Sequence, residues 1–228
     1  MFNKNTSLVN KRKKSIIHGF VYLILTGSAI TVLLYSVMLI SNSDNRPTEQ
    51  GIKLTDQVIQ YKPSVMKNLE AHGKKEYTAI VLALMMQESG GRGDDPMQAS
   101  ESYCGEVGCI KDSETSIEQG VSYFSKVLDK SNGDVKVALQ SYNFGAGFIN
   151  YVLNNGGNYS EKLAIQFSKQ KYEELKHTGI YKCIREEAEQ YDACYGDYKY
   201  VEAVLNYYPA AIELVDDEVQ VALVKQNN

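Results

Sequence analysis

The longest apolar stretch of the chain lies near its N-terminus. Between Ser15 and Ser43 there is no Asp, Glu, Lys or Arg, and residues 16–40 are mostly Val, Leu, Ile, Phe and Tyr. As a helix, this 25-residue segment would extend about 37 Å, enough to cross a hydrocarbon core of roughly 30 Å with some tilt. The pattern therefore predicts one transmembrane helix. A cleaved signal peptide is the alternative, although residues 39–41 offer no small-x-small cleavage site.

After a polar, turn-rich stretch at 41–50, the hydrophobic pattern becomes helical. Residues 54–71 carry apolar side chains at three-to-four spacing, with Pro63 as an expected interruption. Residues 76–88 are apolar almost all round, which predicts a buried central helix. A long loop rich in Gly and containing Cys is expected at about 89–114.

Further helices are expected beyond that loop. Thr115 and Glu118 have the form of a capping box, which would open a helix with an apolar face. Asp134 is placed to cap a helix over 135–143. Because strict two-residue alternation is scarce, the fold class is mainly α with one core. Shorter helices are predicted at 146–153, 160–176 and 198–207.

These patterns divide the chain into an N-terminal membrane portion and one domain outside it. The domain is of ordinary size, and no internal repeat or low-complexity tract interrupts it. The predicted organisation is a basic cytoplasmic segment at 1–15, a transmembrane anchor at 16–40, a linker at 41–50, a helical domain at 51–210 and a C-terminal tail at 211–228.

Charge is distributed unevenly between these parts. The whole chain has a net charge of −4, but residues 1–43 hold five basic side chains and no acidic one. Four of these lie at 11–14, directly before the apolar stretch, so we expect the N-terminus in the cytoplasm and the domain outside the cell membrane. The remaining residues hold 19 basic and 28 acidic side chains, a net charge of −9. Such a domain is not expected to bind nucleic acid.

The cysteines agree with an exported domain. All four, Cys104, Cys109, Cys183 and Cys194, lie in the part expected outside. Two local pairs in an exported domain predict two disulfides, and 104–109 with 183–194 is the most economical pairing. The alternative is a four-thiolate metal site, but neither pair has the C-x-x-C spacing typical of zinc sites. We therefore expect no metal and no cofactor.

Glu88 is the first candidate for chemistry. It ends the apolar segment 76–88 and is followed at once by Ser89-Gly90-Gly91. A carboxyl group at the rim of a hydrophobic core loses hydration, which raises its pKa and suits it to act as a general acid. The alternative is a solvated residue at a helix end beside a flexible loop.

Asp94 and Asp95 bring two more carboxylates into the loop. A pair of carboxyl groups flanking a sugar bond is the machinery of glycoside hydrolysis, in which one protonates the leaving oxygen and the other activates water or attacks. Because Pro96 follows directly, ordinary turn chemistry is the alternative.

Four blocks in order carry a resemblance to a known superfamily. The chain has Glu-Ser-Gly-Gly at 88–91, Asp-Pro-Met-Gln-Ala-Ser-Glu-Ser at 95–102, Ala-Leu-Gln-Ser-Tyr-Asn-Phe-Gly at 138–145, and Tyr-Gly-Asp followed by Tyr-Val-Glu within 195–208. This series resembles the goose-type lysozyme and lytic transglycosylase superfamily. More narrowly, it is similar to the bacterial lysozyme-like domain of Gram-positive cell-wall hydrolases, including the muramidase domain of conjugation-associated members. The resemblance spans roughly 51–208 and implies a lysozyme-like helical fold.

The resemblance implies catalytic roles for two carboxyl groups. Glu88 would be the general acid, and Asp95 would be the second carboxylate, placing or activating water. Asp94 is an outside candidate for that second role.

It also implies four residues that bind substrate. Gln98 would line the cleft, and Ser89 would bond Glu88 or substrate. Tyr142 and Asn143 would orient the sugar near the acid. Ordinary helix packing for Tyr142 and helix capping for Asn143 remain as alternatives.

The function implied is that of a membrane-anchored N-acetylmuramidase. It would cleave the β-1,4 bond between N-acetylmuramic acid and N-acetylglucosamine in peptidoglycan, for local wall remodelling. Expected partners are glycan strands, the membrane through residues 16–40, and envelope proteins of a conjugation or secretion channel. One alternative is a lytic transglycosylase, in which the muramic acid's own 6-hydroxyl attacks and leaves an anhydro product. Another is a non-catalytic wall-binding scaffold.

Overall fold

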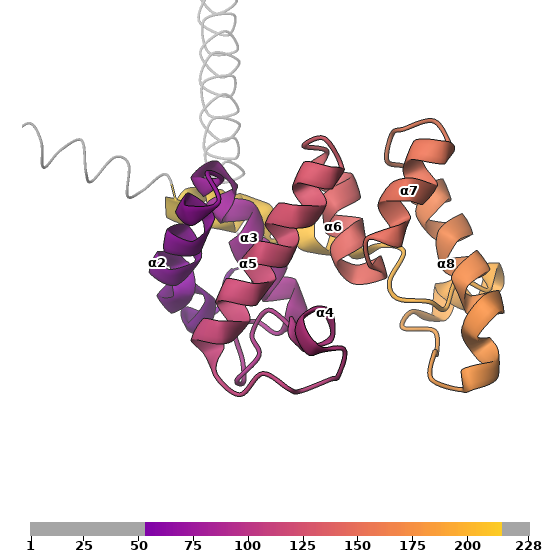
Figure 1. Cartoon of the computed structure of the whole chain (residues 1–228), viewed down its shortest axis with the longest axis horizontal. Helices are drawn as coiled ribbons and strands as arrows, with labels where there is room; N and C mark the ends of the chain where they lie inside the picture. Colours follow the sequence, from indigo (N-terminus) through magenta and orange to yellow (C-terminus); the bar gives the residue numbers. More distant parts are fainter. Residues whose placement is uncertain (1–52, 216–228) are drawn as a thin grey trace, which may run out of the picture. The chain divides into compact units, whose positions relative to one another are not determined.

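A computed structural model describes residues 53–215, and every regular element in this range is a helix (Figure 1). The prediction of a mainly α fold is therefore confirmed for this part of the chain. The predicted cytoplasmic segment, anchor and linker lie outside the described residues. Within 53–215, no helix has both the length and the hydrophobicity that a membrane crossing requires.

The first helix, α2 (Asp56–Ala71), lies within the helical segment predicted at 54–71. Thr55 caps it by accepting a hydrogen bond from the Val58 backbone N–H. The predicted interruption at Pro63 is wrong, because the helix continues through that residue. Pro63 lies on the exposed side, while Val65 and the other buried residues of α2 face α3 and α5. Packing of that face offsets the loss of the one backbone hydrogen bond that proline cannot donate.

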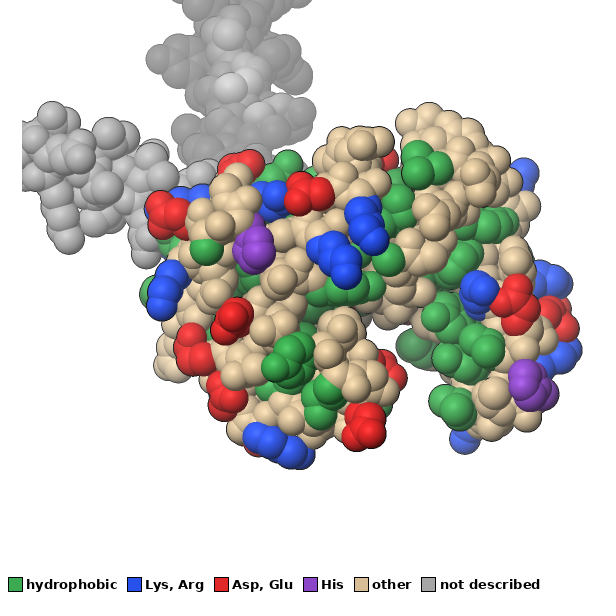
Figure 2. Space-filling view, in the orientation of Figure 1, with side chains coloured by type: hydrophobic (Ala, Val, Ile, Leu, Met, Phe, Trp, Pro, Cys, Tyr) green, Lys and Arg blue, Asp and Glu red, His purple; other side chains and the backbone are tan. Residues whose placement is uncertain are grey.

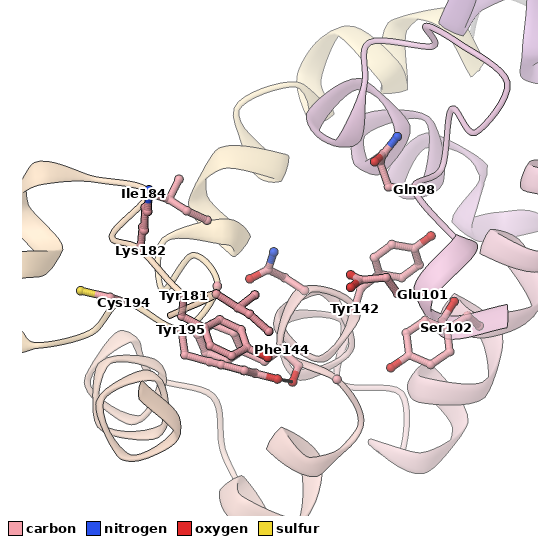
Figure 3. A pocket seen from close by; sticks show the side chains of 15 residues that line it. Gln98, Glu101, Ser102, Tyr142, Phe144, Tyr181, Lys182, Ile184, Cys194 and Tyr195 are labelled. Carbon is pink, nitrogen blue, oxygen red and sulfur yellow. Dashed lines mark hydrogen bonds between the residues drawn. The ribbon is translucent and has the colours of Figure 1, made fainter. Parts of the chain in front are cut away.

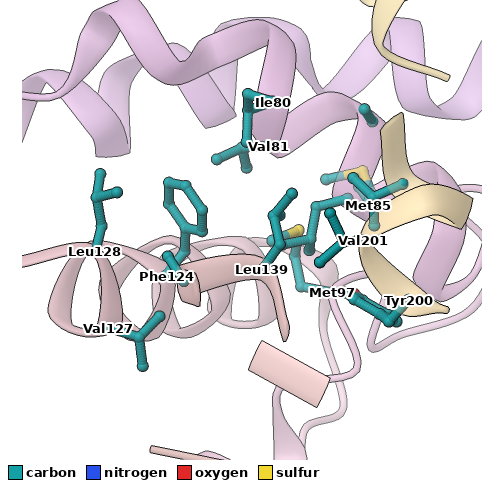
Figure 4. Packing of buried hydrophobic residues seen from close by; sticks show 14 of the residues in the cluster. Ile80, Val81, Met85, Met97, Phe124, Val127, Leu128, Leu139, Tyr200 and Val201 are labelled. Atoms are coloured by element: carbon teal, nitrogen blue, oxygen red, sulfur yellow. The ribbon is translucent and has the colours of Figure 1, made fainter. Parts of the chain in front are cut away.

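The centre of the domain is α3 (Thr78–Glu88), which confirms the buried helix expected at 76–88. A 3-10 turn, η1 (Lys75–Tyr77), precedes it, and eight consecutive residues from Thr78 to Met85 are buried. Helices α2 and α9 (Tyr200–Leu205) pack against it. Figure 4 shows Ile80, Val81 and Met85 of α3 among the side chains of the surrounding helices. The helix thereby carries its last residue, Glu88, to the edge of the core.

The segment after α3 is a long loop with one short helix, α4 (Ser100–Cys104), before α5 (Ser113–Lys130). The predicted capping box at Thr115 is wrong. Asp112 is the cap instead, and its side chain accepts a hydrogen bond from the Thr115 N–H. The apolar face expected for this helix is confirmed, with Ile117, Phe124 and their neighbours fully buried.

The second half of the domain surrounds the end of α6 (Val135–Phe144), whose predicted cap at Asp134 is confirmed by its bond from the Val137 N–H. Phe144 stacks with Phe167 and meets Phe148 edge-on, which joins three helices in one aromatic cluster. The remaining elements are α7 (Gly147–Asn154), α8 (Glu161–Leu175), η2 (Lys176–Thr178), η3 (Glu186–Tyr191) and α9. Residues 208–215 are again helical.

Candidate active site

Glu88 ends α3 and lines a cavity of about 210 Å³. Burial raises the pKa of its carboxyl group to about 7, a hydrogen bond from Tyr200 opposes that rise, and the nearby charge of Asp95 adds to it. The Tyr200 hydroxyl donates to Glu88 Oε1. Among the described residues no hydrogen bond reaches the other carboxyl oxygen. Near neutral pH the group can therefore hold a proton next to an open cavity.

Tyr200 is a residue of the candidate site that sequence reasoning missed. It is buried at the first turn of α9, 112 residues after Glu88 in the chain. Burial, followed by the charge of Glu88, raises the pKa of its hydroxyl well above the usual value, so it stays protonated and donates. Its only sequence signal is its place in the block at 200–208, because no local pattern shows a contact of that range.

Asp95 lines the same cavity as Glu88, but its carboxylate is already occupied. Oδ1 accepts from the Ala99 N–H at 2.8 Å and from Ser116 Oγ at 2.6 Å. Oδ2 accepts from the N–H and the hydroxyl of Ser100, at 3.0 and 2.6 Å. Partial burial raises the pKa of Asp95, but these bonds outweigh it and lower the pKa below its ordinary value. The residue is a fixed negative charge that organises its loop.

Ser89 and Gln98 take different places in this loop. Ser89 is buried, and its hydroxyl donates to the Pro96 carbonyl at 2.8 Å and accepts from the Gly91 N–H. It therefore fastens the loop and does not line the cavity beside Glu88. Gln98 is exposed on a backbone of positive φ, donates to the Asp95 carbonyl at 2.8 Å, and lines the cavity beside Glu88.

Tyr142 and Asn143, at the end of α6, both line that cavity and both also hold the structure together. The Tyr142 hydroxyl donates to the Met97 carbonyl at 2.8 Å, which ties α6 to the loop. Asn143 Oδ1 accepts from the Asp197 N–H at 2.8 Å, which ties α6 to the segment before α9. Asp94, in contrast, is exposed and does not line the cavity beside Glu88.

A second, larger cavity of about 650 Å³ continues from the first. The two share Gln98, Glu101, Tyr142 and Asn143, so they form one groove. In Figure 3 the side chains of Gln98, Glu101 and Ser102 lie on one side of this space, and those of Lys182 and Ile184 lie on the other. Figure 2 shows the hollow as an indentation in the surface between α4 and the α8 region.

Both predicted disulfides are present, and each fastens a segment that borders this groove. Cys104 pairs with Cys109, and the loop between them places Val107 beside the Glu88 cavity. Cys183 pairs with Cys194, and residues next to both cysteines line the larger cavity. Within 53–215, no group of three or more His, Cys, Asp or Glu side chains is arranged to hold a metal ion.

A helical domain that places a partly buried carboxyl group with a raised pKa in an open groove is the arrangement of a lysozyme-like domain. Comparison with known sequences agrees. Residues 55–208 match the sequence profile of the lysozyme-like family, and the chain belongs to that family.

Named relatives extend this result. The chain is 35% identical over 196 residues to the uncharacterized membrane protein YocA of Bacillus subtilis, covering 83% of this chain and 84% of that one. It is 43% identical over 120 residues to the bifunctional muramidase/DL-endopeptidase CwlT of the same organism, covering 53% of this chain but only 36% of CwlT. A solved Staphylococcus aureus structure, described as similar to a lipoprotein of the NLP/P60 family, matches with a TM-score of 0.59 and 34% identity, covering 69% of this chain and 54% of that one.

Proposed function

We propose that this protein is a peptidoglycan glycosidase that cleaves the β-1,4 bond between N-acetylmuramic acid and N-acetylglucosamine. The observation that carries the proposal is the Glu88 carboxyl group, whose pKa of about 7 lets it hold a proton beside the groove formed by the two cavities. The 120-residue similarity to a protein named as a muramidase supports the same bond.

In this proposal Glu88 gives its proton to the bridging oxygen as the bond to C1 of the muramic acid breaks. Positive charge then develops on the sugar ring, close to the fixed negative charge of Asp95. Water attacks C1 and loses a proton, which the Glu88 carboxylate takes back. Glu88 is the available base because all four hydrogen-bonding positions of the Asp95 carboxylate are filled by Ala99, Ser100 and Ser116.

The occupied carboxylate of Asp95 also favours a second candidate, the lytic transglycosylase. That reaction needs no second carboxylate, because the muramic acid's own 6-hydroxyl attacks C1 and gives its proton to Glu88. The sugar is then released as a 1,6-anhydro product.

Mass spectrometry of fragments released from purified walls tests both candidates. Hydrolysis gives fragments ending in reducing N-acetylmuramic acid. Transglycosylation gives fragments about 18 Da lighter, the mass of one water lost by stoichiometry. Absence of any released fragment would contradict both reactions and favour the wall-binding scaffold.

We also propose that the enzyme works from the cell membrane, with residues 16–40 as a single-pass anchor and residues 1–15 in the cytoplasm. The apolar stretch and the basic cluster before it support this topology, as does the similarity to a protein named as a membrane protein. With this placement, we propose that the enzyme remodels the wall locally, beside a conjugation or secretion channel. Protease treatment of intact cells, stripped of their wall, should digest the domain and spare the N-terminus.

A further inference from the structure

One wall of the larger cavity is formed by Ile180, Tyr181, Lys182 and Ile184, and it carries apolar side chains that face solvent. Ile180 is 75% exposed and Ile184 is 66% exposed, and both line this cavity. Among the residues described, seven large hydrophobic side chains are strongly exposed, and three of them, these two and Val107, border the groove. Exposed apolar groups concentrated along one groove indicate a surface that binds a ligand.

A single cation lies within this wall. Lys182 lines the cavity between the two isoleucines, and Figure 3 shows it with Ile184 on the side of the cavity opposite Gln98 and Tyr142. No ion pair or hydrogen bond joins its ammonium group to any residue in the range 53–215. The other charged residue of the cavity is Glu101, on the α4 side. The wall therefore offers an exposed positive charge flanked by exposed apolar side chains.

This wall is held in place by interactions on either side of Lys182. The Cys183–Cys194 disulfide closes the segment. Arg185 forms two hydrogen bonds of 2.8 Å with the buried carboxylate of Asp197. Asp197 in turn is bound through its backbone by Gln140 and Asn143 of α6. The lysine is thus presented from a fixed backbone rather than from a free loop.

We propose that this wall binds the stem peptide of the peptidoglycan strand, with Lys182 pairing with a peptide carboxylate and the isoleucines contacting the peptide's apolar side chains. The inference rests on the proposed function, because it takes the strand to lie along the groove from Glu88. A stem peptide is attached to the muramic acid next to the cleaved bond, carries carboxylates and contains alanine methyl groups. The enzyme would accordingly prefer glycan that still carries its peptides over glycan from which they have been removed.

The test compares two substrates that differ only in the peptide: purified peptidoglycan, and the same glycan strands after amidase treatment. The variants are Lys182→Ala, Lys182→Glu and the charge-preserving Lys182→Arg. Lys162→Ala is the matched control, because Lys162 is an exposed lysine on α8 outside the groove. We expect Lys182→Ala to lower kcat/KM on peptide-bearing strands about fivefold or more, and Lys182→Glu to lower it further. Lys182→Arg should restore most of it, and all variants should act alike on the stripped strands.

An equal loss on both substrates, or no loss on either, would overturn the inference. A binding measurement tests the stem-peptide site independently of the proposed function. It follows co-sedimentation with insoluble peptidoglycan of variants that also carry Glu88→Gln. If the wild type cleaves neither substrate, the glycosidase proposal fails. Weaker sedimentation of the Lys182→Ala protein would then still support the stem-peptide site, whereas equal sedimentation would overturn it.

Discussion

At the scale of single residues, the central feature is the unequal treatment of two carboxyl groups. Glu88 is desolvated, and one hydrogen bond reaches it, so its pKa rises to about 7. Asp95, in the same cavity, accepts four hydrogen bonds and stays ionised. The place of Glu88 at the end of an apolar helix predicts its environment. The saturation of Asp95 could not be predicted, because two of its bonds come from the hydroxyl groups of Ser116 and Ser100, whose positions depend on how the loop folds.

The first prediction concerns pH. Only protonated Glu88 can act as the acid, so activity should fall as pH rises through about 7. Tyr200→Phe removes the hydrogen bond that lowers the pKa of Glu88, so this fall should move to higher pH, with turnover reduced several-fold. Initial rates of wall digestion between pH 4 and 9 measure both effects. Tyr61→Phe, a half-buried tyrosine on α2 outside the groove, is the control. A profile unchanged by Tyr200→Phe would show that the contact does not tune the acid.

The second prediction concerns stability. A carboxyl group whose pKa is raised by folding destabilises the folded state once pH exceeds its unfolded pKa of 4.5. The loss in unfolding free energy is complete above a pH of about 7. Glu88→Gln removes this penalty. The unfolding free energy of the variant, relative to that of the wild type, should therefore rise by roughly 1–3 kcal/mol from pH 4 to pH 8. Urea unfolding at both pH values measures the difference, with Glu118→Gln on the exposed face of α5 as control. A difference independent of pH would contradict the assigned environment.

At the scale of elements, periodicity and caps predicted the helices that bury a face. Residues 76–88 and the Asp134 cap are examples, because both signals are local. The start of α5 was misplaced because Asp112 and Thr115 both suit a cap, and the choice depends on where the preceding loop ends. That loop is arranged by contacts with α5, among them the Met97 N–H bond to Ser116 Oγ at 3.0 Å. Sequence patterns do not contain such contacts.

The third prediction tests the contact between α5 and this loop. A Cβ at Gly120 would lie 2.5 Å from Met97 Cβ, so Gly120→Ala must push the loop away from the helix. Met97 is fully buried, and its carbonyl accepts the Tyr142 hydroxyl, so the shift would reach the groove. We expect a loss of about 1–3 kcal/mol in unfolding free energy and a clear loss of activity.

Gly147→Ala is the matched control for that substitution. Gly147 is also helical, but a Cβ there would lie 3.9 Å from Phe167, an ordinary contact. The control should be neutral or slightly stabilising, because alanine has a higher helix propensity than glycine. Equal effects of the two substitutions would show that the close approach of Met97 is unimportant.

At the scale of the whole molecule, the sequence predicts two parts with opposite charge. The basic N-terminal portion suits the cytoplasmic face of a membrane, whereas the remainder carries a net charge of −9. A negative domain is not drawn to the anionic polymers of a cell wall by long-range attraction. Tethering through the proposed anchor and short linker would supply the encounter instead, by keeping the groove at high local concentration beside the strands of the wall.

The central claim is that Glu88 is the acid that breaks the glycan bond, and one comparison tests it most directly. Release of soluble fragments from purified walls is measured for the wild-type chain and for Glu88→Gln, with circular dichroism to establish that both are folded. The amide keeps the size of the side chain and can accept the Tyr200 hydrogen bond, but it has no proton to give. We predict that the variant remains folded and loses activity by a factor on the order of 10² or more. Full activity in folded Glu88→Gln would contradict the assignment.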